Sequence, residues 1–214
     1  MRRVTLTFDN GPTSGVTECV LEILGELRIL ATFFVIGRNL DKTAAAELMK
    51  RAHDAGHWIG NHTLSHTVAL GDRPELDYAV SEIEGAQQRI GKCSHPEKLF
   101  RPYGKSGLLG PHLLSRAALD HLVAQNYRTV LWNNVSRDWE DPDGWVERCI
   151  ALVSQEAWSV VALHDIEGAC LKRLPELLRR LDDLGVIYEQ DFPDTVTLTR
   201  AGQIVSLPQS YVTD

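Results

Sequence analysis

Short runs of apolar and β-branched residues alternate with longer segments of helical period along most of the chain. The pattern predicts strands at Val4–Phe8, Thr32–Ile36, Trp58–Gly60, Leu99–Arg101, Thr129–Trp132, Val160–Leu163 and Val186–Tyr188. Between them it predicts helices at Thr17–Leu30, Thr43–Ala55, Glu75–Ile90, Pro111–Gln125, Pro142–Glu156 and Leu171–Leu184. Strand starts recur about every 30 residues, which is the length of a strand–helix unit in a parallel sheet. We therefore expect an α/β fold.

Seven strand–helix units fit either a doubly wound open sheet or a (β/α) barrel, and periodicity alone cannot choose between them. No linker rich in Pro, Gly or Ser interrupts the alternation before about residue 190, so we expect a single domain over residues 1–214. The tail adds one strand-like run at Thr195–Leu198 and is otherwise expected to be irregular.

Composition and charge narrow the class of protein. The 214 residues hold 22 Lys and Arg against 29 Asp and Glu, and a formal net charge of -7 disfavours nucleic acid as a partner. The longest nearly apolar stretch, Ile29–Gly37, is about half the ~20 residues that a membrane-spanning helix needs. No apolar leader precedes the first strand pattern, so we expect a cytoplasmic protein, or a secreted one if a leader has been removed. The four cysteines form no CxxC pair, which favours reduced thiols.

Polar residues gather where the predicted strands end. In parallel α/β folds the active site lies at the carboxyl ends of the strands. The residues found there are, in chain order, Asp9, Asn10, Asn61, His62, His66, Arg101, Tyr103, Asp138, Trp139, His164 and Asp165. Histidines, carboxylates and an arginine from different strands could therefore meet on one face of the sheet.

Two histidine pairs have the spacing that places both rings on one helical turn. His62 and His66 follow a strand, and this spacing brings two imidazoles within reach of one divalent ion. His53 and His57 have the same spacing but straddle Gly56, a helix terminator, so we expect them to be structural. A third metal ligand should come from another strand end, and the Asp9–Asn10 pair fits that pattern.

Five short motifs stand in order along the chain. They are Thr7-Phe8-Asp9-Asn10-Gly11-Pro12, Asn61-His62-Thr63-Leu64-Ser65-His66, Arg101-Pro102-Tyr103-Gly104, Arg137-Asp138-Trp139 and Leu163-His164-Asp165. Together they resemble the five motifs of the polysaccharide deacetylases, the carbohydrate esterase family that includes chitin, peptidoglycan and chitooligosaccharide deacetylases. The first is similar to TFDDGP and the second to NHTxxH. The resemblance spans about residues 4 to 190 and implies a distorted (β/α) barrel of seven or eight parallel strands.

The resemblance also implies an activity and a cofactor. Members of this family hydrolyse N-acetyl groups on amino-sugar oligosaccharides or polysaccharides with a divalent metal ion, usually zinc. Carried over to this chain, His62 and His66 would be the imidazole ligands of the metal. Asp9 would be the general base that activates water, and Arg101 would orient it.

The remaining motif residues would handle the oxyanion, the leaving group and the sugar. The backbone N–H of Tyr103 would stabilise the oxyanion together with the metal. His164 would protonate the leaving amine, with Asp138 helping to keep its imidazole protonated. The residues implied to line the sugar pocket are Trp132, Trp139 and Leu163.

Two positions depart from the family pattern. The second Asp of TFDDGP is the family's carboxylate ligand, and this chain has Asn10 there. An amide oxygen is neutral and binds zinc more weakly than a carboxylate, so metal affinity should fall. The fourth motif usually begins with an Asp three residues before its Asp-Trp pair, and this chain has Val135 there.

Asn10 leaves three interpretations open. The chain can be an enzyme with a weaker or different metal site, which is our working hypothesis. It can be a pseudoenzyme that binds carbohydrate without hydrolysing it, or a metal-independent hydrolase of cyclic amides from the same superfamily. The chain carries no wall-binding module, which favours a soluble N-acetylated oligosaccharide over an insoluble polymer as substrate. The sequence leaves the oligomeric state open, and we expect Asp143 and Asp165 to be structural.

Overall fold

The sheet is organised around a buried central strand, β1 (Arg3–Asp9). The computed structural model describes residues 1–214. β1 pairs in parallel with β2 (Thr32–Val35) on one edge and with β8 (Trp158–His164) on the other. Because side chains alternate along a strand, Val4, Leu6 and Phe8 enter one hydrophobic core while Asp9 and its partners face the opposite side. The strand thus delivers Asp9 to the carboxyl edge of the sheet.

The sheet is mostly parallel and curls without closing. Its strand order is β11-β10-β6-β4-β3-β2-β1-β8-β7, and β9 (Ile187–Glu189) pairs with the first half of β1. The other parallel strands are β3 (Trp58–Asn61), β4 (Leu99–Phe100), β6 (Arg128–Val130) and β7 (Asn134–Val135). β10 (Thr197–Arg200) adds antiparallel to β6 and carries β11 (Gln203–Ile204). The result is an incomplete (β/α) barrel, which confirms the expected fold class.

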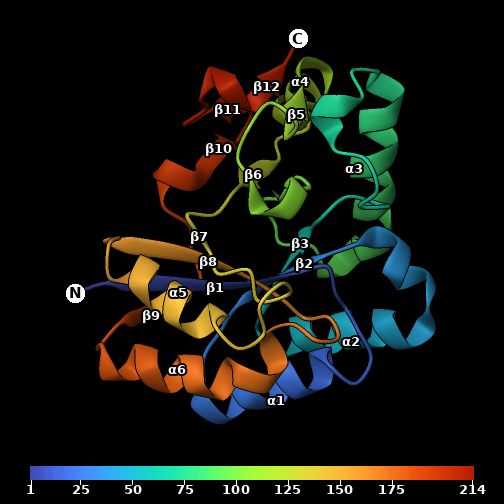
Figure 1. Cartoon of the computed structure of the whole chain (residues 1–214). Helices are drawn as coiled ribbons and strands as arrows, with labels where there is room; N and C mark the ends of the chain where they lie inside the picture. The colour runs from blue at the N-terminus through green and yellow to red at the C-terminus, as the bar shows by residue number, and fades with distance from the viewer.

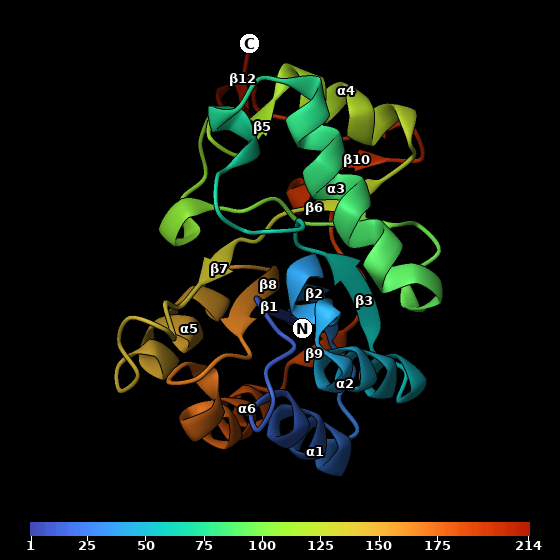
Figure 2. The same ribbon diagram turned by 90° about the vertical axis from the view of Figure 1, so that its right-hand side faces the viewer.

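Helices cover the outside of the sheet in two groups (Figure 1). The first core packs the sheet against α1 (Thr17–Leu27), α2 (Thr43–Asp54), α5 (Trp145–Val153) and α6 (Leu174–Asp183). The second core involves α3 (Leu76–Ile90) and α4 (Arg116–Ala124). Figure 2 shows α3 and α4 at the opposite end of the molecule from α1, α2 and α6. No helix combines the length and the apolar character needed to cross a lipid bilayer.

The predicted elements are present with shifted boundaries. Every predicted strand has a counterpart, but the one expected at Thr129–Trp132 ends at Val130. Three predicted helices start too early: α4 begins only at Arg116, where the Ser115 hydroxyl caps it, and α5 and α6 begin at Trp145 and Leu174. The strands not predicted are very short: β7, β11, and the pair β5 (Leu114–Ser115) and β12 (Val212–Thr213). A strand of two residues has no measurable alternation, so periodicity could not find it.

Candidate active site

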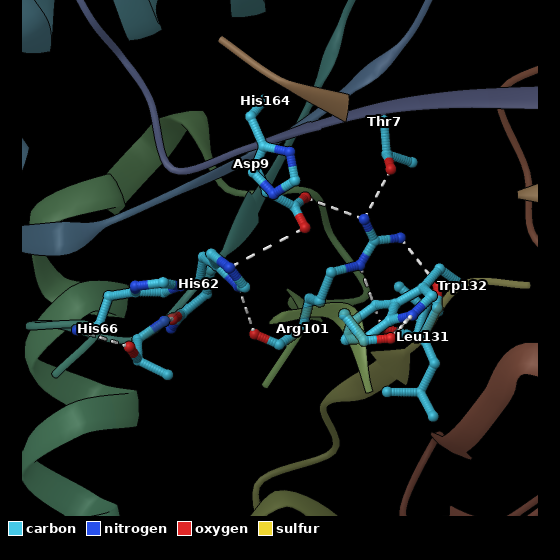
Figure 3. A network of polar contacts seen from close by, with 12 residues as sticks. Thr7, Asp9, His62, His66, Arg101, Leu131, Trp132 and His164 are labelled. Carbon is cyan, nitrogen blue, oxygen red and sulfur yellow. Dashed lines mark hydrogen bonds and ion pairs between the residues drawn. The ribbon is translucent and has the colours of Figure 1, made fainter. Parts of the chain in front are cut away.

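Asp9 and Arg101 form a buried pair at the centre of the site. Asp9 is 4% exposed and Arg101 is fully buried. Nη1 of Arg101 donates to Oδ1 of Asp9 (2.9 Å) and to the Thr7 hydroxyl (2.6 Å), while Nη2 donates to the backbone oxygen of Leu131 (2.9 Å; Figure 3). Burial lowers the pKa of Arg101 and the charge of Asp9 opposes that effect. The guanidinium therefore fixes one carboxylate oxygen of Asp9 and leaves the other free.

His62 and His66 lie side by side, but not on a helix. Their ring centroids are 4.8 Å apart. The chain between them turns through Thr63 (φ 67°), and His66 also has a positive φ of 54°. The predicted helical turn is therefore wrong, although the predicted proximity of the two rings is present. A short non-repeating turn with left-handed residues places the two rings side by side.

Both imidazoles are neutral and offer lone pairs. Nδ1 of His62 lies 2.8 Å from the backbone oxygen of Arg101, and because a carbonyl only accepts, Nδ1 carries the hydrogen and Nε2 does not. Burial lowers the pKa of each ring to about 3. The 3.9 Å contact between Nε2 of His62 and Oδ2 of Asp9 is consequently not an ion pair near pH 7. The His66 ring also packs on the ring of Tyr103, with centroids 4.1 Å apart.

Asn10 completes a donor set that suits a divalent cation. It lines the same cavity as His62 and His66, and its Oδ1 is buried without a hydrogen-bond partner. The Asn39 side-chain amide donates to the Asn10 backbone oxygen (2.9 Å) and holds the residue at a φ of 77°. No group of three His, Cys, Asp or Glu side chains that could hold a metal ion is present, so a third ligand beside His62 and His66 would have to be another kind of group, such as the Asn10 amide oxygen. Two imidazoles and one amide fit a divalent ion, but with less charge than a set containing a carboxylate.

His164 and Asp138 form a second charged pair on the other side of the cavity. Nδ1 of His164 is 2.8 Å from Oδ1 of Asp138, and the His164 backbone N–H donates to Oδ2 (2.9 Å). Burial alone would lower the pKa of His164. The hydrogen bond and charge of Asp138, with the charges of Asp9 and Asp165, outweigh burial and raise that pKa above its usual value. The rings of His164 and Trp139 pack in a T-shaped arrangement, with centroids 4.5 Å apart.

The cavity between these groups holds about 230 Å³. Besides the groups described above it is lined by Tyr103, Gly104, Ser106, Gly107, Trp132, Val135, Trp139, Ala162 and Ile166. Nε1 of Trp132 donates to the backbone oxygen of Gly107 (3.2 Å) and anchors the loop that forms one wall. The structure thus brings together every residue implied by the motifs except one.

Leu163 is that exception, and its expected place in the sugar pocket is wrong. Its side chain is fully buried in the first core, whereas Ala162 lines the cavity. The reason is that successive side chains of a strand point to opposite faces of the sheet. Ala162 and His164 therefore face the cavity, and Leu163, which lies between them on β8, faces the core. Leu163 is paired in register with Phe8, another core residue.

Sequence reasoning missed several contributors to the site. Thr7 stands two residues before Asp9, hence on the same face of β1, and this period could have identified it. Ser106 and Gly107, which line one wall of the cavity, lie in a short irregular segment, so no hydrophobic periodicity in the sequence marked them as site residues. Asp165 is structural as expected: it is fully buried, and its Oδ2 accepts from the Thr17 hydroxyl (2.6 Å). His57 is also structural, since its Nδ1 accepts from the Ala31 N–H.

Comparison with known proteins identifies the family. Residues 1–124, more than half of the chain, match the family model described as polysaccharide deacetylase. The chain belongs to the polysaccharide deacetylase family. A peptidoglycan-N-acetylglucosamine deacetylase of Bacillus cereus is 32% identical to this deacetylase-family chain over 188 residues, 83% of this chain and 82% of that one. A chitooligosaccharide deacetylase of Azorhizobium caulinodans is 32% identical over 166 residues, 76% and 73% of the two chains.

Two solved structures share the fold of this deacetylase-family chain. A structure described as T48 deacetylase with substrate superposes with a TM-score of 0.71 at 29% identity, covering 88% of each chain. A family 4 acetyl xylan esterase from Clostridium thermocellum, solved with a cobalt ion, gives a TM-score of 0.71 at 25% identity and the same 88% coverage of each chain. The fold and the hydrolase family therefore rest on sequence and structure alike.

Proposed function

We propose that this deacetylase-family protein removes N-acetyl groups from an amino-sugar oligosaccharide or polysaccharide. The observation that carries the proposal is the cavity itself, where a held carboxylate (Asp9) and a charged imidazole (His164) flank two neutral imidazoles. Amide hydrolysis needs an activated water, a stabilised oxyanion and a proton for a poor leaving group. Separate residues of this chain are available for each task.

Asp9 is suited to the role of general base. Arg101 binds Oδ1, so Oδ2 remains free to accept a proton from a water molecule in the cavity. A divalent ion held by His62, His66 and Asn10, with zinc the family's usual choice, would polarise the acetyl oxygen and acidify that water. The backbone N–H of Tyr103 has no acceptor within the chain and is free to bind the developing oxyanion.

His164 is suited to the role of general acid. The raised pKa favours the protonated imidazole, and Asp138 fixes the ring by accepting from both Nδ1 and the backbone N–H. Nε2 is then the nitrogen that can give its proton to the leaving amine. Trp139 and Trp132 supply flat apolar surfaces in the same cavity, as sugar rings require.

The experiment is acetate release from defined N-acetylglucosamine oligomers, with free amine measured in parallel and Zn²⁺ or Co²⁺ supplied. We expect Asp9→Asn and His164→Asn each to lower kcat by about 10²–10⁴-fold with little change in substrate binding. In the wild type, kcat should fall as pH rises through the raised pKa of His164, because the acid is then lost. His53→Asn, which alters an exposed histidine on α2 that does not line the cavity, is the matched control. Undiminished acetate release by Asp9→Asn would exclude this mechanism.

A non-catalytic carbohydrate-binding protein is the second candidate, and Asn10 is the observation that favours it. The chain has no three-membered set of acidic, histidine or cysteine ligands for a metal. If this candidate holds, the wild type binds the oligosaccharide without releasing acetate, and Asn10→Asp gains both metal and activity. If our proposal holds, the wild type releases acetate and Asn10→Asp mainly lowers the metal concentration needed.

A further inference from the structure

Glu82 is a buried carboxylate on the inner face of α3. It is 5% exposed, its helix neighbours Ala79, Ile83 and Ala86 are fully buried, and it forms no salt bridge. An ionisable group placed in an apolar face without a cation partner is costly, and it persists only where its hydrogen bonds contribute something specific. Packing alone would be served better by an apolar residue at this position.

The hydrogen bond that Glu82 makes leads directly to the candidate metal ligands. Its Oε2 accepts from the backbone N–H of Ser65 (2.9 Å), the residue immediately before His66. Both Thr63 and His66 have positive φ angles, which non-glycine residues seldom adopt without support from their surroundings. The turn that orients the His66 ring is therefore one that needs external contacts to persist.

The same face of α3 holds the start of this turn as well. The Asn61 side chain donates to the backbone oxygen of Ile83 (2.8 Å) and accepts from the Thr63 N–H (2.9 Å). Leu64 lies so close to Gly85 that a Cβ there would be 2.9 Å from its Cδ2. Asn61 thus secures the side of the turn that carries His62, and Glu82 secures the side that carries His66.

We propose that Glu82 is a positioning residue that holds the Ser65–His66 backbone, so that the His66 ring lies beside that of His62 and can share a divalent ion with it. The inference rests on the proposed function in that it treats His66 as a metal ligand. What this role requires of residue 82 is a hydrogen-bond acceptor at the end of its side chain, which accepts from the Ser65 N–H. Glutamine keeps such an acceptor in the same place and methionine fills the same space without one.

The test compares Glu82→Gln and Glu82→Met in the wild type and in an Asn10→Asp background, whose carboxylate strengthens metal binding. Zn²⁺ affinity is measured by titration calorimetry. We expect Glu82→Met to weaken binding by about 10–100-fold, the usual effect of losing a group that orients a ligand, and Glu82→Gln to stay close to its parent. Glu84→Met is the matched control, because its carboxylate binds His121 and Tyr127 instead of the turn.

Crystal structures of the metal-free variants separate this inference from the proposed function. In Glu82→Met we expect the His66 ring to leave its place beside His62, and in Glu82→Gln to keep it. Unchanged ring positions and unchanged affinity in Glu82→Met would overturn the role of Glu82 and leave the proposed function standing. If neither parent binds Zn²⁺, the proposed function fails, and displacement of His66 in Glu82→Met still supports the positioning role.

Discussion

Asp165 places a fully buried carboxyl group directly behind the loop that carries Asn10. Its carboxylate fills the space beside Gly11, where a Cβ would lie 2.1 Å from Oδ2. Oδ2 accepts from the Thr17 hydroxyl, which in turn accepts from the Thr13 N–H (2.8 Å), while Oδ1 has no partner. Burial raises the pKa of Asp165 to about 7. The residue is therefore protonated in the folded protein over a pH range in which the unfolded chain would ionise it.

This shift predicts how stability depends on pH. A carboxyl whose pKa is raised on folding stabilises the native state below its unfolded pKa, and the contribution is lost as pH rises through the folded pKa. The change from 3.8 to about 7 corresponds to an effect on the order of 4 kcal/mol, lost between about pH 4 and 7. Asp165→Asn should flatten the unfolding free energy in this window, measured by urea denaturation. The exposed Asp143→Asn is the control, and an unchanged slope in Asp165→Asn would contradict the assignment.

At the scale of elements, the strands explain what the sequence could and could not predict. Parallel strands end at a common edge, so the meeting of Asp9, His62 and His164 follows from where their strands end. Their finer geometry does not follow, because the turn after β3 uses left-handed residues that are not glycine. The misplacement of Leu163 has another cause: motif order indicated a neighbourhood, whereas strand alternation decides which side chain faces the cavity.

β3 offers a test of how tightly the strand that leads to His62 is packed. Gly60 lies under the Phe34 ring, and a Cβ added there would be 2.5 Å from Cδ1 and Cε1 of that ring. Because Phe34 is fully buried and cannot move freely, Gly60→Ala should lower the unfolding free energy by about 1–3 kcal/mol. Gly25→Ala is the matched control, since nothing lies within 4 Å of its added Cβ on α1 and the helix should gain up to about 1 kcal/mol. Equal stability changes in both variants would refute the packing argument.

At the scale of the whole molecule, the curled sheet joins segments from both ends of the chain, because β1 and β10 belong to the same sheet. In the tail, β10 is the counterpart of the strand predicted at Thr195–Leu198, and it extends the sheet beyond β6. Arg128 on β6, almost fully buried, binds Glu97, Asp191 and the backbone oxygen of Phe192 and so ties the tail to the barrel. Such ion pairs join residues that are far apart in the sequence and leave no local pattern. The position of the tail in the sheet could therefore not be predicted from periodicity, whereas the site residues could be predicted from the short motifs.

We propose that Asp9, Asn10, His62, His66 and His164 form one metal-assisted hydrolytic site in which an amide takes the place of a carboxylate ligand. The most direct measurement is anomalous diffraction at the zinc edge from crystals of the wild-type protein soaked in Zn²⁺. We expect one peak in the cavity, bonded to ring nitrogens of His62 and His66 at about 2.0–2.1 Å and to Oδ1 of Asn10. The absence of a peak between the two histidines at saturating Zn²⁺, or an ion held without Asn10, would contradict the proposed site.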